Sequence, residues 1–168
     1  MELLDSKKIH DGYAVDVASK RYRRADGNEV TREVVEHPGS VAILAYDEEA
    51  VYLVRQPREA VEADGLLEIP AGTLEPGEDE LACAKRELAE EVGLAAERWQ
   101  LLKKVHTSPG VISEVATIFA ATGLSEASGE QDEDEQIEIV RWPRAELEAA
   151  IAEVTDATTL IALLLLDE

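Results

Sequence analysis

Three glutamates, Glu87, Glu90 and Glu91, lie at helical spacing in a segment whose apolar residues also recur at helical spacing. A helix over 78–92 places all three carboxylates on the face away from its apolar stripe. Like charges at this spacing cost about a few tenths of a kcal/mol each, and a cation between them removes that cost. Mg²⁺ and Mn²⁺ prefer such hard carboxylate oxygens. The pattern therefore indicates a divalent metal site, and a solvated acidic helix face is the alternative.

A longer pattern surrounds these glutamates: Gly72-x5-Glu78-x7-Arg86-Glu87-Leu88-Ala89-Glu90-Glu91-Val92-Gly93-Leu94. It resembles the Nudix box at every specified position, and a motif of this length is far more specific than a short glycine pattern. The resemblance implies a loop–helix–loop on an α/β/α sandwich with a mixed β-sheet. It also implies hydrolysis of a nucleoside diphosphate linked to another moiety, with Mg²⁺ or Mn²⁺ as cofactor at two or three ions per site.

The resemblance assigns roles within the box. Glu87, Glu90 and Glu91 are the expected metal ligands, together with the carbonyl of Ala71, which the following glycine allows to approach the metal. Glu90 and Arg86 are the expected catalytic residues, and we expect Arg86 to orient carboxylates through a bidentate pair. Glu78 is expected to hold Arg86 or to cap the helix, and Gly93 to end it.

Downstream residues narrow the substrate class. Pro109 lies fifteen positions beyond Leu94, in a Ser-Pro-Gly context that resembles the ADP-ribose pyrophosphatase branch of the family. By that resemblance Ser108, Gly110 and Glu114 bind substrate, with Glu114 facing the terminal ribose. An ordinary turn is the alternative for Ser-Pro-Gly.

Upstream, Val54-Arg55-Gln56-Pro57-Arg58 and Leu67-Glu68-Ile69-Pro70-Ala71-Gly72 also look like that branch. Arg58 is the expected diphosphate or adenine contact and Arg55 the second, with exposed strand-end charges as the alternative. Glu33 is the candidate near the adenine, in a segment that the branch often presents from a second subunit. His37 is expected to pack at a strand end.

The acidic segment 130–135 is where the family resemblance places a catalytic base. Water attack on phosphorus needs a group that accepts or positions the proton, and the box glutamates are committed to metal. By resemblance Glu133 is that catalytic base and Glu135 a further metal ligand. Spacing alone does not rank one above the other, and a solvated turn is the alternative.

Composition excludes several classes of partner. The 168 residues carry 37 acidic and 16 basic side chains, a formal charge of −21, so neither nucleic acid nor an anionic membrane is an expected partner. The one cysteine, Cys83, excludes an internal disulfide. The longest apolar run, 160–166, is too short for a membrane span, and the N-terminus has no secretory pattern, so a cytoplasmic location is expected.

The order of strands and helices predicts an α+β fold or a mixed-sheet sandwich. The family resemblance implies, more narrowly, an α+β fold with a Nudix-type α/β/α sandwich after an N-terminal antiparallel strand region. Strands are predicted at 13–18, 30–35, 41–46, 51–54, 66–69, 99–106, 115–121 and 136–142, and helices at 78–92, 143–151 and 156–166. We assign 1–36 to the N-terminal strand region and 37–168 to the hydrolase domain. The branch resemblance implies a homodimer that exchanges the N-terminal strands.

The predicted reaction is hydrolysis of ADP-ribose to AMP and ribose 5-phosphate. A hydrolase of another nucleoside diphosphate sugar, such as GDP-mannose, is the first alternative, because the purine pocket is weakly specified. A non-catalytic nucleotide sensor is the second, although such proteins typically lose box carboxylates and this chain has all of them.

Overall fold

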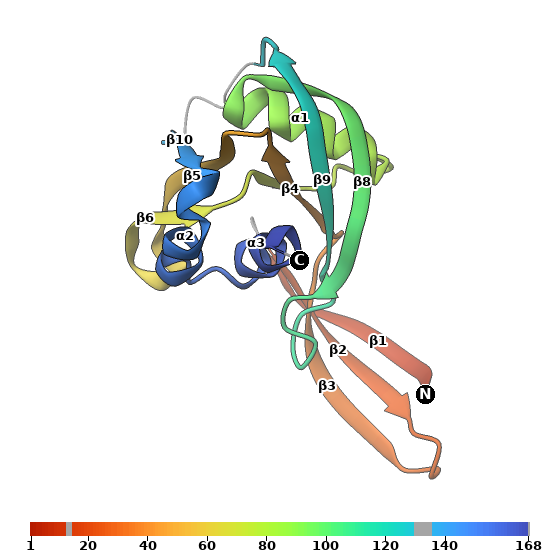
Figure 1. Ribbon diagram of the computed structural model, residues 1–168. Coiled ribbons are helices and arrows are strands. Elements are labelled where there is room, and N and C mark those ends of the chain that lie inside the picture. Colours follow the sequence, from red (N-terminus) through yellow and green to blue (C-terminus); the bar gives the residue numbers. More distant parts are fainter. Residues whose placement is uncertain (13–14, 130–135, 168) are drawn as a thin grey trace. The chain divides into compact units, whose positions relative to one another are not determined.

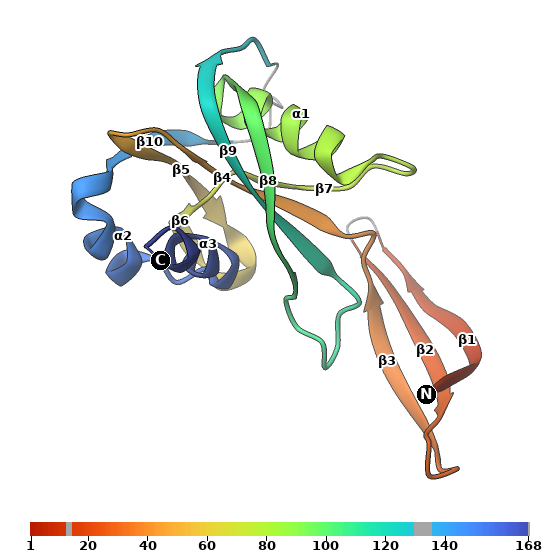
Figure 2. The same cartoon turned by 45° about the vertical axis from the view of Figure 1, so that its right-hand side comes forward.

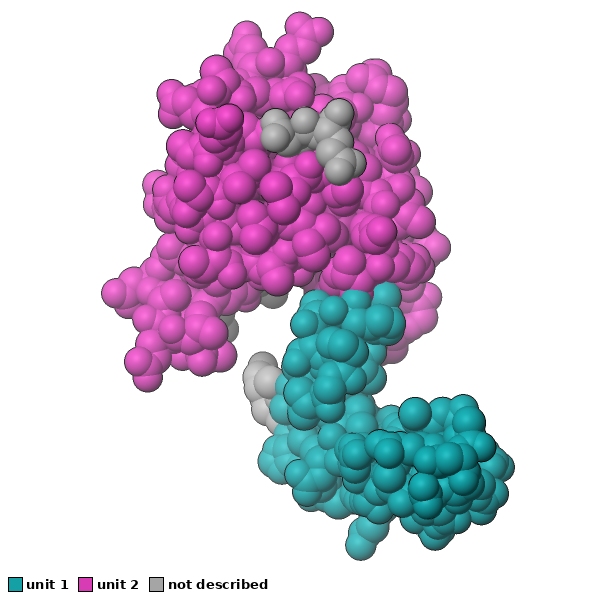
Figure 3. All heavy atoms as spheres, turned by 60° about the horizontal axis from the view of Figure 1, so that its bottom comes forward, with its two compact units in different colours: residues 1–39, 106–115 teal, residues 40–105, 116–168 magenta. Residues whose placement is uncertain are grey.

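The computed structural model describes residues 1–12, 15–129 and 136–167. It divides into two compact units, one of residues 1–39 and 106–115, the other of residues 40–105 and 116–168 (Figure 3). The break between the two units lies after Gly39. The domain boundary expected at residue 36 stays a prediction. The inclusion of 106–115 in the first unit was not predicted, because that segment is distant in sequence.

The first unit is a three-stranded antiparallel sheet of β1 (Glu2–Asp11), β2 (Asp16–Arg23) and β3 (Glu29–Glu36) (Figure 1). The sequence Asp26-Gly27-Asn28 predicts a turn before the last strand, and this turn is present, with Gly27 at φ +83°. The segment 106–115 joins β3 through a bridge between Val35 and Ile112. Strand β1 was not predicted, because it is exposed along most of its length and has no apolar alternation.

The second unit is built on a seven-stranded mixed sheet in the order β10-β5-β4-β9-β8, with β6 beside β5 and β7 beside β4. Its strands are β4 (Ser40–Tyr46), β5 (Ala50–Arg58), β6 (Ala63–Glu68), β7 (Ala71–Thr73), β8 (Leu94–His106), β9 (Val115–Glu126) and β10 (Glu138–Pro143). The central β4 is parallel to β9 and antiparallel to β5 and β7.

Helices cover both faces of this sheet (Figures 1 and 2). Side chains of β4 alternate between the faces: Ala42 and Leu44 pack with α2 (Leu147–Glu153) and α3 (Ala157–Asp167), and Val41 and Ile43 pack with α1 (Glu80–Val92). Both cores are mostly aliphatic, and the one under α1 also contains Phe119. The sandwich with a mixed sheet and the preceding antiparallel strands confirm the predicted fold class.

Two predicted helix boundaries were wrong. The helix expected from Glu78 begins at Glu80, because the Asp79 carboxylate caps it by accepting hydrogen bonds from the N–H groups of Leu81 and Ala82. The helix expected from Pro143 is preceded by a 3₁₀ turn, Arg144–Glu146, since Pro143 ends β10. A second 3₁₀ turn, Glu59–Val61, follows β5.

The ends predicted at Gly93 and Asp156 are confirmed. Gly93 ends α1 in the left-handed conformation at φ +70° and donates its N–H to the carbonyls of Ala89 and Leu88. The Asp156 carboxylate accepts from the N–H of Thr159 in the first turn of α3. Among the residues that the structure describes, none of the helices is long and apolar enough to cross a membrane.

Candidate active site

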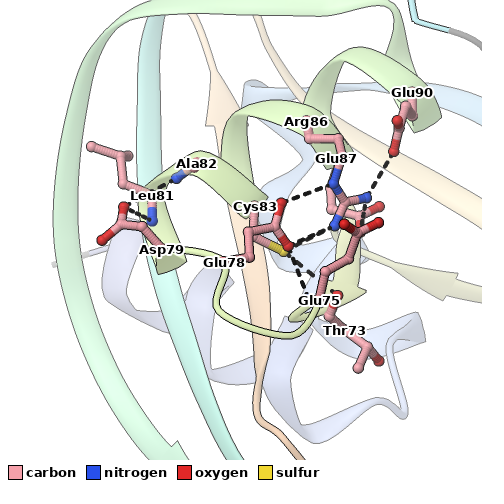
Figure 4. A network of polar contacts seen from close by, with 10 residues as sticks. All are labelled: Thr73, Glu75, Glu78, Asp79, Leu81, Ala82, Cys83, Arg86, Glu87 and Glu90. Carbon is pink, nitrogen blue, oxygen red and sulfur yellow. Dashed lines mark hydrogen bonds and ion pairs between the residues drawn. The ribbon is translucent and has the colours of Figure 1, made fainter.

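Arg86 is the centre of a charged network on the outer face of α1 (Figure 4). Its Nε and Nη2 donate to the two carboxylate oxygens of Glu78 at 3.0 and 3.1 Å, a bidentate pair. Its Nη1 donates to Glu87 at 2.7 Å and to Glu90 at 2.9 Å. The predicted pairing of Glu78 with Arg86 is present, and a single guanidinium orients three carboxylates.

The network shifts the pKa values of its members. Hydrogen bonds from Arg86 lower the pKa of Glu78 to about 2, with help from the Glu75 N–H. The same pairing with Glu78 raises the pKa of Arg86, and Glu90 and Glu87 add to the effect. Burial and the nearby Glu78 carboxylate raise the pKa of Cys83 to about 12. Arg86 and Glu78 therefore stay charged, and Cys83 stays a neutral thiol, at physiological pH.

Two contacts join α1 to strand β7, which precedes it in the chain. Glu91, only 3% exposed, accepts a hydrogen bond from the N–H of Ala71 at 3.1 Å. Glu87 lies directly over Gly72: a Cβ at that position would stand 1.8 Å from Glu87 Oε1. Glycine is therefore required there for the close approach of carboxylate and backbone.

A second charged cluster lies at the end of β5. Arg58 donates from Nε and Nη2 to the two oxygens of Glu68 at 2.8 and 2.6 Å, and Gln56 donates to the same carboxylate at 3.4 Å. The pairing with Glu68 raises the pKa of Arg58, with smaller contributions from Glu91 and Asp156. Glu68 and Gln56 are both buried. The buried Glu68 carboxylate thus holds the Arg58 guanidinium in place.

Arg55, the second predicted contact, is engaged elsewhere. Its guanidinium pairs with Glu153 at the end of α2 and donates to the carbonyl of Gly65 at 3.4 Å. Since neighbouring strand residues point to opposite faces, Arg55 projects from the face opposite Gln56. The structure does not bring Arg55 into the Arg58–Glu68 cluster.

The remaining described candidates belong to the first unit. Glu33 is exposed on β3, opposite Ser19. The Ser108 carbonyl accepts from the N–H groups of Val111 and Ile112, so the Ser-Pro-Gly segment is a turn, with Gly110 exposed. Glu114 accepts from Thr107 Oγ1 at 2.6 Å and lies 3.8 Å from Nδ1 of His37.

His37 lies at a strand end, as predicted. Its N–H donates to Ser113 Oγ, and its Nδ1 accepts from the N–H of Gly39. Glu133 and Glu135 lie outside the described residues.

The donor set of α1 fits a hard divalent cation in kind and charge. Glu87, Glu90 and Glu91 offer carboxylate oxygens on one helix, and Arg86 binds the first two. No group of three His, Cys, Asp or Glu side chains in the described part of the chain is arranged to hold an ion. Cation binding would therefore exchange Arg86 contacts of Glu87 and Glu90 for metal contacts.

A family model described as "NUDIX domain" matches residues 36–163. The chain belongs to the NUDIX domain family. Among similar proteins, this NUDIX chain is 38% identical to the ADP-ribose pyrophosphatase of Bacillus subtilis, over 94% of this chain and 87% of that protein. It is 35% identical to the methanol dehydrogenase activator of Bacillus methanolicus, over 95% and 88%.

The NUDIX fold is also shared with a solved structure. The crystal structure of an ADP compounds hydrolase matches with a TM-score of 0.84 and 27% identity, covering 98% of this chain and 91% of that one. The resemblance inferred from the box is thus confirmed at the level of the family.

Glu68 was not assigned a role from the sequence. The signal for it was an acidic residue that directly follows the apolar pair Leu66-Leu67 and directly precedes Ile-Pro-Ala-Gly. A buried carboxylate needs a partner, and Arg58, ten residues earlier on the adjacent strand β5, was the nearest basic candidate on that strand pair.

Proposed function

We propose that this NUDIX protein hydrolyses ADP-ribose to AMP and ribose 5-phosphate by attack of water on phosphorus, with Mg²⁺ or Mn²⁺ as cofactor. The observation that carries the proposal is the complete carboxylate set of α1, oriented by Arg86 beside the Ala71–Gly72 backbone. The similarity to an ADP-ribose pyrophosphatase over nearly the whole chain supports this substrate.

Glu87, Glu90, Glu91 and the Ala71 carbonyl would hold the metal, which supplies charge neutralisation at the diphosphate and a more acidic water. Such help is needed, because a chain with a formal charge of −21 repels an anionic substrate. Arg86 keeps the carboxylates in place, and Glu78 keeps Arg86 in place.

Arg58 is proposed to bind the diphosphate. Its Nε and Nη2 donate to Glu68, so the guanidinium is already oriented before substrate arrives. Little side-chain entropy is therefore lost when substrate binds. Glu133 is proposed as the base and Glu135 as an additional metal ligand, on the family resemblance alone. Glu33, Ser108, Gly110, Glu114 and Arg55 are proposed contacts for the remainder of the substrate.

A homodimer is proposed from the first unit. Among its described residues Ala18 is the only buried hydrophobic side chain, whereas Leu3, Ile9 and Val111 are 53, 49 and 46% exposed. A cavity of about 330 Å³ lies in the same unit, lined by Tyr22, Val30, Val34 and the Pro109–Ile112 segment among others. A second copy of the chain would cover this apolar surface. A cytoplasmic location is part of the proposal.

The test is a comparison of kcat/KM for ADP-ribose and GDP-mannose in saturating Mg²⁺, with products identified by chromatography. The proposal expects ADP-ribose to be preferred, with AMP and ribose 5-phosphate in equal amounts. A higher kcat/KM for GDP-mannose would favour the alternative substrate. Binding of both compounds without hydrolysis of either would favour a non-catalytic nucleotide sensor.

A further inference from the structure

The chain between β6 and β7 crosses from one strand partner to another. The last residue of β6, Glu68, pairs with Val54 of β5, and the first residue of β7, Ala71, pairs with Ala42 of β4. Ile69 and Pro70 lie between these ladders. Ile69 is buried, so its N–H needs a partner from elsewhere.

Thr159 of α3 supplies that partner. Its Oγ1 accepts a hydrogen bond from the Ile69 N–H at 2.9 Å, across ninety positions of sequence. Thr159 has no exposed surface, and its own N–H donates to Asp156 at 2.7 Å. The helix cap therefore fixes the backbone of Thr159, and its hydroxyl is shielded from solvent. The next residue, Pro70, is fastened separately, since its carbonyl accepts from the Ile43 N–H of β4 at 2.8 Å.

Ile69 and Pro70 link the two charged clusters of the site. On one side of Ile69, Glu68 holds the guanidinium of Arg58. Two residues later, the N–H of Ala71 holds the carboxylate of Glu91. A shift of Ile69 would move both, because the three residues between Glu68 and Gly72 allow little independent adjustment.

We propose that Thr159 is a positioning residue of the active site: its buried hydroxyl fixes Ile69, and through it sets Glu68–Arg58 and Ala71–Glu91 relative to each other. Its role is to keep the carboxylate that would bind metal and the guanidinium that would bind diphosphate in register. The inference rests on the proposed function for its activity measurement but not for its metal-binding measurement.

The experiment compares the full-length wild type with Thr159→Val, which keeps the shape and removes the hydroxyl, and Thr159→Ser, which keeps the hydroxyl. Thr158→Val is the matched control, a threonine in the same helical turn outside these hydrogen bonds. Each protein is tested for Mn²⁺ affinity by titration without substrate, for kcat and KM with ADP-ribose, and for thermal unfolding. Enzyme measurements are made well below every melting temperature.

Thr159→Val is expected to weaken Mn²⁺ binding about 10-fold and to lower kcat/KM for ADP-ribose by a similar factor, the usual effect of losing a group that orients a metal ligand. Thr159→Ser should restore both to within about 2- to 3-fold, and Thr158→Val should match wild type. If Thr159→Val does not fold, Thr159→Ala, which also removes the hydroxyl but places no methyl group against the Ile69 N–H, takes its place, with exchange of the Ile69 amide hydrogen as an added readout.

A Thr159→Val protein with a lower melting temperature but wild-type Mn²⁺ affinity and kcat/KM would overturn the inference, because the hydroxyl would then serve stability alone. Unchanged Ile69 amide exchange in Thr159→Ala would also overturn it. If wild type binds Mn²⁺ but does not hydrolyse ADP-ribose, the proposed function fails while the Mn²⁺ comparison still tests Thr159.

Discussion

Arg23 and Arg86 each bind more than one glutamate, but in different surroundings. Arg23, in the sheet of the first unit, pairs with Glu2 and Glu29 at 3.1 Å, and all three side chains are at least 40% exposed. Arg86 pairs with Glu78, Glu87 and Glu90 at 2.7–3.0 Å, and none of these side chains is more than 33% exposed.

This difference in exposure distinguishes ordinary surface ion pairs from a charged network that belongs to a functional site. Exposed pairs such as those of Arg23 contribute about 0–1 kcal/mol and are screened by salt. In the α1 network the carboxylates outnumber the guanidinium, and Glu87 lies so close to Gly72 that a side chain at that position would collide with it. Among the described residues of the first unit, Ala18 is instead the only buried hydrophobic side chain, which makes the unit a candidate surface for association. The predictions below test each side of this contrast.

The largest effect is expected from Glu91→Gln. The amide oxygen can still accept from the Ala71 N–H, so the fold is retained, but the negative charge that would bind metal is lost. We expect kcat with ADP-ribose to fall by about three orders of magnitude or more. Glu97→Gln, at an exposed glutamate of β8, is the control and should keep wild-type activity. Wild-type turnover of Glu91→Gln in limiting Mg²⁺ would remove Glu91 from the site.

The acidic segment is expected to give the next largest effect. Glu133→Gln cannot accept a proton, so turnover should fall by about 10²–10⁴ with KM nearly kept. Glu135→Gln should be rescued in part by higher Mg²⁺, because weaker metal binding responds to mass action. Steady-state kinetics over a Mg²⁺ series separates the two. If higher Mg²⁺ rescues only Glu133→Gln, the two residues exchange their proposed roles. If both variants hydrolyse ADP-ribose at the wild-type rate, Glu90 becomes the candidate base.

The next prediction concerns dimerisation of the protein through its first unit. Wild type should be a dimer by light scattering at micromolar concentration, and the double variant Ile9→Lys/Val111→Lys should be a monomer with a raised KM for ADP-ribose, because charges replace apolar contacts. Leu101→Lys, at a comparably exposed leucine of β8, is the control and should remain a dimer. A fully active wild-type monomer would defeat the dimer proposal.

The smallest effect concerns stability against pH. Arg86 lowers the pKa of Glu78 from its usual 4.5 to about 2, so the pair stabilises the folded state fully above about pH 5. That stability is lost as the pH falls through 4.5 toward 2. The melting temperature of Glu78→Gln should lie below that of wild type at pH 7, and the gap should narrow by pH 3. A gap independent of pH would mean that shape, not charge, matters at this position.

The sequence predicted the parts of the molecule that depend on local pattern. The box helix, its glycine stop, the turn at Gly27 and the pairing of Glu78 with Arg86 follow from spacing and from the family resemblance. The fold class followed from the change in hydrophobic period along the chain.

The features that sequence reasoning missed depend on distant contacts or on exposed strands. Strand β1 has no buried face to impose alternation, so no pattern marks it. The engagement of Arg55 with Glu153 and of Thr159 with Ile69 joins residues about ninety or more positions apart. Two arginines three residues apart look equivalent in sequence, and only the register of β5 with β6 and β10 separates their partners.

The central claim is that the α1 carboxylates support metal-dependent hydrolysis of ADP-ribose. Its most direct test is phosphorus NMR of the reaction of the wild-type protein with ADP-ribose, in excess Mg²⁺ and in excess EDTA. The account predicts AMP and ribose 5-phosphate as the phosphorus products with Mg²⁺, no reaction with EDTA, and full recovery when Mg²⁺ is restored. Equal rates with EDTA, or an intact diphosphate in the product, would contradict it.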